Sequence, residues 1–124
     1  MKFETLDAWK RSVQLSVEVY KHFSDSRDFG FKDQITRSCL SIPSNIAEGL
    51  EKQSLKDQVR FIDYSKGSAA EFATQSIIST EIGYIDDQTS KKWLKKLKKY
   101  FQCYLSYKHT KNKNSNPPLI LNLP

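Results

Sequence analysis

Residues 34–49 read QITRSCLSIPSNIAEG and form the most informative segment of this 124-residue chain. Their apolar side chains recur at helical spacing and are Ile35, Cys39, Ile42 and Ile46. Beside this stripe runs a row of hydrogen-bonding side chains: Gln34, Arg37, Ser41, Asn45 and Glu48. Because polar groups in a dry contact need partners, the row indicates a helix that meets neighbours on two sides. We therefore predict the central helix of a bundle that also self-associates.

A proline lies inside this helix at position 43. Because Pro43 cannot donate to the carbonyl of Cys39 and its ring crowds the preceding turn, we expect a kink rather than a break. Ser41 and Ser44 are the candidates to satisfy the freed backbone groups. Gly49 stands where a left-handed cap would end the helix.

Length and composition predict a single soluble globular domain without disulfides. Four glycines and four prolines leave few turns, which favours a few long elements. Cys39 and Cys103 lie far apart in helical patterns, so we expect buried free thiols. Lys2, Glu4 and Asp7 interrupt any apolar run at the N-terminus, and no segment approaches membrane-spanning length. We therefore expect a cytoplasmic protein.

The segment before residue 34 predicts a first helix from Thr5 or Leu6 to His22. It carries two apolar stripes. The larger consists of Leu6, Trp9, Val13, Ser16, Val17, Tyr20 and Phe23, and the smaller of Ala8, Leu15 and Val19. The second stripe indicates contact on another side. The second helix is expected to follow Phe29-Gly30-Phe31, with Asp33 in its first turn.

A capping box at residues 54–57 predicts that a third helix starts near Leu55. No stop signal precedes Gly83, so this helix is long. One face is mostly small and carries Phe61, Ser65, Ser68, Ala69, Phe72, Ser76, Ser79 and Gly83. Other flanks are also apolar, with Ile77, Ile78, Ile82, Tyr84 and Ile85. A helix that is apolar on several sides is buried on several sides, which favours self-association.

A fourth helix is expected to be capped by Thr89 or Ser90 and to end near Lys108. We assign residues 1–109 to the bundle domain and residues 110–124 to a C-terminal tail. Residues 1–87 carry eleven Lys and Arg and all fourteen acidic residues, whereas residues 88–124 carry nine lysines and no acid. Candidate nucleic-acid-binding residues are Lys91, Lys92, Lys95, Lys96, Lys98 and Lys99. A lysine-covered solvent face is the alternative, and charge alone leaves both open.

The sequence contains no Gly-rich phosphate loop, His-x-x-x-His or Cys-x-x-Cys pair, or nucleophile elbow. We therefore predict no catalytic residues, metal site or cofactor. Arg37 is expected to meet Glu71 as a structural link, because buried charges need partners whatever the function. The predicted structural polar network comprises Gln34, Arg37, Asn45, Glu48, Ser68 and Glu71.

Four segments resemble one protein family in order and spacing over about residues 3–107. They are Leu6–Trp9, Arg37–Gly49, Gly67–Glu71 and Ile82–Ile85. The chain is similar to the four-helix bundle proteins encoded in 23S rRNA intervening sequences. This resemblance implies an antiparallel up-down four-helix bundle, a homopentamer and association with ribosomes. The related accessory protein of diversity-generating retroelements binds nucleic acid and associates with a reverse transcriptase. The tail after Lys108 is outside the family pattern.

Two functional hypotheses follow. The first is a non-enzymatic oligomer, pentameric by resemblance, that binds RNA or DNA through the lysines of the fourth helix. The second is a protein-interaction scaffold for a partner such as a polymerase, with the lysines keeping the assembly soluble.

Overall fold

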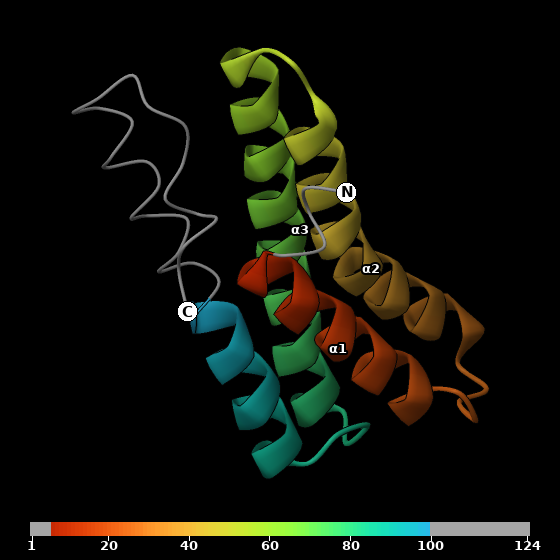
Figure 1. The fold of residues 1–124 in the computed structure, drawn as a ribbon. Helices are drawn as coiled ribbons and strands as arrows, with labels where there is room; N and C mark the ends of the chain where they lie inside the picture. Colours follow the sequence, from red (N-terminus) through yellow and green to blue (C-terminus); the bar gives the residue numbers. More distant parts are fainter. Residues whose placement is uncertain (1–5, 100–124) are drawn as a thin grey trace.

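The computed structural model describes residues 6–99, which form four helices and no strand (Figure 1). Helix α1 spans Asp7–His22, α2 spans Phe29–Glu51 and α3 spans Leu55–Glu81. A fourth helix covers residues 87–99. Successive helices run in opposite directions, which confirms the all-α up-down bundle. The predicted domain boundary at residues 109/110, the tail and the end of the fourth helix lie outside the described residues.

The core is built from one buried stripe of each helix. In α1 the smaller of the two predicted stripes is buried, with Leu15 and Val19 almost completely enclosed, and Leu6 and Phe23 at the two ends of the larger stripe are buried as well. The α2 stripe, Ile35, Cys39, Ile42 and Ile46, is buried as predicted. Trp93 of the fourth helix packs on Phe72 of α3 with ring centroids 5.9 Å apart. Trp93 is 2% exposed and therefore belongs to the core.

Helix α2 continues through Pro43, and the neighbouring helices contact the backbone of that turn. Ser16 Oγ of α1 lies 3.2 Å from the Cys39 carbonyl oxygen, the group that Pro43 leaves without its helical donor. On the other side, Ser65 Oγ of α3 donates to the Ile42 carbonyl at 2.9 Å. The expectation that Ser41 and Ser44 satisfy the freed group is wrong. Their hydroxyls bond the carbonyls four residues earlier, Arg37 and Leu40.

Within residues 6–99, the later three helices each begin at a side chain that accepts a backbone N–H group, whereas α1 follows Leu6 without such a cap. Ser54 accepts from Asp57 at 3.1 Å, which confirms the predicted start of α3. The second helix starts earlier than predicted, because Asp28 caps it by accepting from Phe31 N. Asp33 therefore lies beyond the first turn. Asp86 caps the fourth helix instead of Thr89 or Ser90, since its carboxylate accepts from Thr89 N at 2.7 Å.

The end of α3 is a Schellman motif. Gly83 has a positive φ of 80°, the conformation that favours glycine, so it terminates the helix and does not extend its small face. The N–H of Tyr84 donates to the Ser79 carbonyl at 2.8 Å. The Tyr84 hydroxyl then reaches Asp28 at 2.6 Å and ties this end of α3 to the start of α2. This hydrogen bond lowers the pKa of the Asp28 carboxyl, and the backbone N–H of Phe31 lowers it further.

Gly49 does not cap α2, which continues to Glu51. Gly49 instead allows α2 and α3 to approach each other closely. A Cβ atom at this position would lie 3.0 Å from the Cβ of Phe61 and 3.2 Å from the backbone oxygen of Gln58. The absence of a side chain therefore lets the C-terminal part of α2 pack against the first turns of α3.

Replacing this glycine tests the close approach. We expect Gly49→Ala to lower the free energy of unfolding by about 1–3 kcal/mol, because the added methyl group overpacks the α2–α3 contact. Gly67→Ala is the matched control, since a Cβ there meets no atom within 4 Å. The control should raise stability by about 0.5–1 kcal/mol through helix propensity. Urea unfolding at equal protein concentrations measures both, and equal effects of the two changes would contradict the assignment.

Candidate functional site

A basic groove lies between α1 and the fourth helix. It has a volume of about 290 Å³ and is lined by Arg11, Gln14, Lys92, Lys95, Lys96 and Lys99. The lysine spacing places these four side chains on one side of the fourth helix, toward α1. Residues from two helices thus form one cationic concavity, which is a stronger attractor for an anion than a flat row of lysines.

Of the six predicted lysines, only four line this groove. Lys91 and Lys98 are exposed but lie outside it. Sequence reasoning missed Arg11 and Gln14, which stand three residues apart on α1. Their own segment gives no sign of anion binding, because their partners follow about eighty residues later in the chain. Only the packing of α1 on the fourth helix brings the two sets together.

A carboxylate from α1 pairs with two of the groove lysines from an adjoining hollow, which Glu18 and Lys92 line together. Glu18 accepts a hydrogen bond from Lys96 Nζ at 2.7 Å, and Lys92 Nζ lies 3.6 Å away. The hydrogen bond from Lys96 lowers the pKa of Glu18; desolvation opposes this shift, and the charges of Lys96 and Lys92 reinforce it. Glu18 is therefore ionised at neutral pH. At the other end, Arg11 pairs with Asp7 at 2.7 Å.

An apolar groove lies on the opposite side of α1, against α2. Its volume is about 370 Å³, and its lining residues are Val13, Ser16, Val17, Tyr20, Lys21, Thr36, Arg37, Leu40 and Pro43. Three of them are unusually exposed for apolar side chains: Val17 at 47%, Tyr20 at 63% and Leu40 at 57%. In Figure 1, α1 separates the fourth helix from α2, so the two grooves flank one helix. The larger apolar stripe predicted for α1 thus contributes to an open surface as well as to the core.

A second apolar surface lies on α3. Ile77, Ile78 and Ile82 are each about half exposed. The sequence predicted apolar flanks here, and among residues 6–99 these three side chains remain exposed. Ile85 differs, since it is 5% exposed and joins the core.

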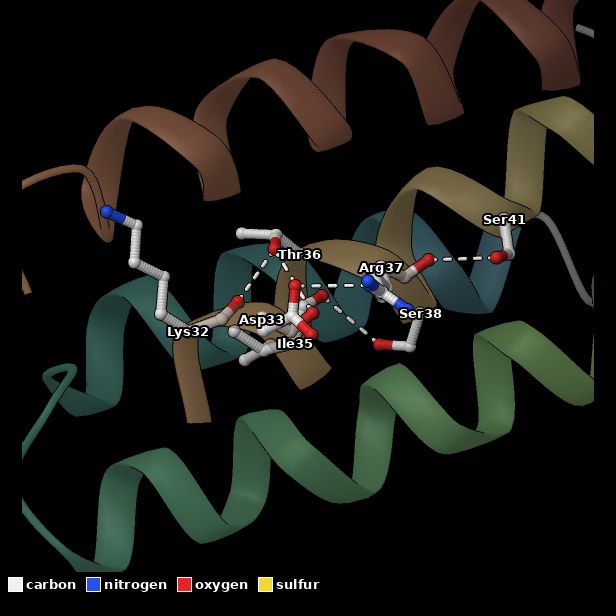
Figure 2. Close-up of polar contacts among 7 residues, drawn as sticks. All are labelled: Lys32, Asp33, Ile35, Thr36, Arg37, Ser38 and Ser41. Atoms are coloured by element: carbon white, nitrogen blue, oxygen red, sulfur yellow. Dashed lines mark hydrogen bonds and ion pairs between the residues drawn. The ribbon is translucent and has the colours of Figure 1, made fainter. Parts of the chain in front are cut away.

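The predicted polar network does not assemble within the described residues. Arg37 pairs with Asp33 on its own helix at 3.1 Å instead of reaching Glu71 (Figure 2). Asn45 donates to the Ser41 carbonyl, and Gln34 and Glu48 are exposed. Besides the Ser65–Ile42 contact, Ser38 of α2 donates to the side-chain oxygen of Gln75 on α3 at 2.5 Å. Ser41 and Asn45 are half-buried, and a network across copies stays a prediction.

The comparisons with known proteins identify the family. The family model of the 23S rRNA-intervening sequence protein matches residues 4–104. The chain belongs to this family. Its fold is similar to a solved structure of a protein with unknown function from the S23 ribosomal protein family of Bacteroides thetaiotaomicron VPI-5482. The TM-score is 0.69 at 22% identity, covering 73% of this chain and 88% of that one. A comparison with curated proteins gives no match.

The family match confirms the resemblance that the four sequence segments indicated. The likeness to the solved structure supports the four-helix fold. None of the helices within residues 6–99 combines the length and apolar character needed to cross a lipid bilayer. The same part of the chain contains no cluster of three or more His, Cys, Asp or Glu side chains that could hold a metal ion.

Cys39 is a buried free thiol. It is 1% exposed, and desolvation raises the pKa of its thiol to about 12, against a smaller opposing effect of the Ser16 hydroxyl. Since the thiolate is the nucleophile, this cysteine is unreactive near neutral pH. Cys103 lies outside the described residues.

We expect Cys39 to resist alkylation in the folded protein. In a Cys103→Ser variant at about pH 8, iodoacetamide should modify the remaining thiol only after urea unfolding, because the folded state holds it neutral and enclosed. Mass spectrometry of the native and unfolded samples measures this. Rapid modification of the native protein would contradict the burial of Cys39.

Proposed function

We propose that this protein is a non-enzymatic, self-assembling helical protein that binds RNA or another nucleic acid in the basic groove. The observation that carries the proposal is the convergence of Arg11 with four lysines of the fourth helix on one concave surface. Cationic side chains along a groove contact backbone phosphates and give binding that is salt-dependent and weakly sequence-specific. The family name refers to 23S rRNA, which makes RNA the first ligand to test.

Two charge-matched variants test the groove. Lys95→Gln/Lys99→Gln removes two lining charges, whereas Lys91→Gln/Lys98→Gln removes two exposed charges of the same helix that do not line it. Fluorescence anisotropy with a single-stranded oligonucleotide across a salt series measures the affinity and the slope of log affinity against log salt concentration. The groove variant should bind more weakly, with a salt slope shallower by about 1.4, because two phosphate contacts are lost. The control should retain most of the affinity.

Neutralising all four groove lysines together should abolish binding. Binding that survives this change, or that falls equally in both double variants, would overturn the assignment of nucleic-acid binding to the basic groove. If the wild type binds no nucleic acid at low salt and a protein co-purifies with it, the scaffold function is favoured, with the lysines serving solubility.

Self-assembly is supported by two different apolar surfaces on one chain. The apolar groove is concave, and the exposed Ile78 and Ile82 lie four residues apart at the end of α3, where Ile82 is the C-cap residue and lies on the same side as Ile78. Contact between unlike surfaces of successive copies is heterologous, and such contacts close into rings when the rotation allows it. The expected number of five rests on the family resemblance. Because the basic groove lies on the other side of α1, it would stay open in the assembly and repeat around it, which strengthens weak single contacts.

Variants at the two apolar surfaces test this arrangement. Leu40→Glu and Ile78→Glu each place a charge in a dry contact, so light scattering should show that each variant alone is a monomer. Mixed together, they should form a one-to-one complex, since each retains the surface that the other lacks. Phe29→Glu is the control, because Phe29 is exposed but lines neither groove. A monomeric wild type, or variants that still form the full assembly, would overturn the proposal.

A further inference from the structure

Glu18 lies next to the basic groove without lining it, in an adjoining hollow that Lys92 also lines. The groove is lined by cations and one glutamine, yet a carboxylate from the same helix as Arg11 and Gln14 is held by two of the lining lysines. Arg11, Gln14 and Glu18 follow one another at helical spacing, so they share the side of α1 that faces the fourth helix. The carboxylate therefore stands beside the surface that a ligand phosphate would occupy.

The Lys96–Glu18 contact is short and only partly exposed. The side chains of Lys96 and Glu18 are 28% and 35% exposed, so both are partly desolvated, and their atoms lie 2.7 Å apart. Lys92 is 62% exposed and stands 3.6 Å from the same oxygen atom. One carboxylate thus partly neutralises two of the four groove lysines. Within residues 6–99, Lys95 and Lys99 have no such acidic partner.

We propose that Glu18 is an internal anion that competes with backbone phosphates for Lys92 and Lys96. This inference rests on the proposed function and assigns its regulation to one residue. Lys95 and Lys99 make the first contacts with the nucleic acid. Phosphate reaches Lys92 and Lys96 only by displacing the Glu18 carboxylate, which lowers affinity for any single site.

The exchange has a consequence for salt dependence. A lysine that binds a phosphate ordinarily releases a counterion from the nucleic acid. The number of counterions released sets the slope of log affinity against log salt concentration. At Lys92 and Lys96, displacement of Glu18 frees a carboxylate that takes up a cation from solution. Fewer ions are therefore released than the count of groove lysines implies.

The test is Glu18→Gln, which keeps the size and hydrogen-bonding capacity of the side chain and removes its charge. A fluorescently labelled oligouridylate is titrated into the full-length protein across a salt series. At low salt the variant should bind about two- to fivefold more tightly, the range for a partly exposed ion pair. The slope of its log affinity against log salt concentration should be steeper by about 0.7, because the net release rises by one counterion for each bound groove.

Glu51→Gln is the matched control. It makes the same change in net charge on α2, which does not line the basic groove, and should leave the slope unchanged. Glu18→Asp keeps the charge but shortens its reach, so its affinity should fall between wild type and Glu18→Gln. Thermal unfolding followed by circular dichroism confirms that each variant is folded under the binding conditions.

The outcomes separate the two proposals. If wild type binds and folded Glu18→Gln binds equally or more weakly, Glu18 orients the lysines or has no role, and the competition is overturned while the groove function stands. If Glu18→Gln loses its fold, Glu18→Asp must still bind more tightly than wild type, or the inference fails. If neither wild type nor Glu18→Gln binds at low salt, both the function and the inference are overturned.

Discussion

The bundle depends on how α2 satisfies its backbone around Pro43. A proline inside a helix leaves one carbonyl without its usual donor, and a buried carbonyl needs a partner. Here Ser16 of α1 lies next to the Cys39 carbonyl. Ser65 of α3 donates to the Ile42 carbonyl, three residues further along the same helix. The two contacts hold α2 from both sides at the same turn. Small serine side chains suit this role because they allow close approach while still supplying a hydrogen-bond donor.

The position of α1 creates the two grooves. Once Leu15 and Val19 enter the core, the helix has one flank toward the fourth helix and another toward α2. Arg11, Gln14 and Glu18 lie on the first flank, and Val13, Val17 and Tyr20 lie on the second. Charged and apolar surfaces are thereby separated by the width of one helix. Our proposals for nucleic-acid binding and self-assembly consequently use different surfaces of the chain.

Local signals predicted much of the fold. The capping box before α3, the buried stripe of α2 and the small face of α3 were all read from spacing and side-chain type, since these depend on neighbouring residues. The caps at Asp28 and Asp86 were missed because several polar residues near each start compete for the role. Gly49 was misassigned for a different reason: its lack of a side chain is required by Phe61 and Gln58, which belong to another helix.

The sequence by itself determined an all-α chain, a central helix interrupted by proline, and a row of lysines on the fourth helix. These features are periodic or local, so they can be read without knowing which helices touch. Only the tertiary structure decided which stripe of α1 is buried and which polar residues become neighbours. Arg37 pairs with Asp33 rather than Glu71, and Glu18 meets Lys92 and Lys96, because helix packing sets the distances between side chains far apart in the chain.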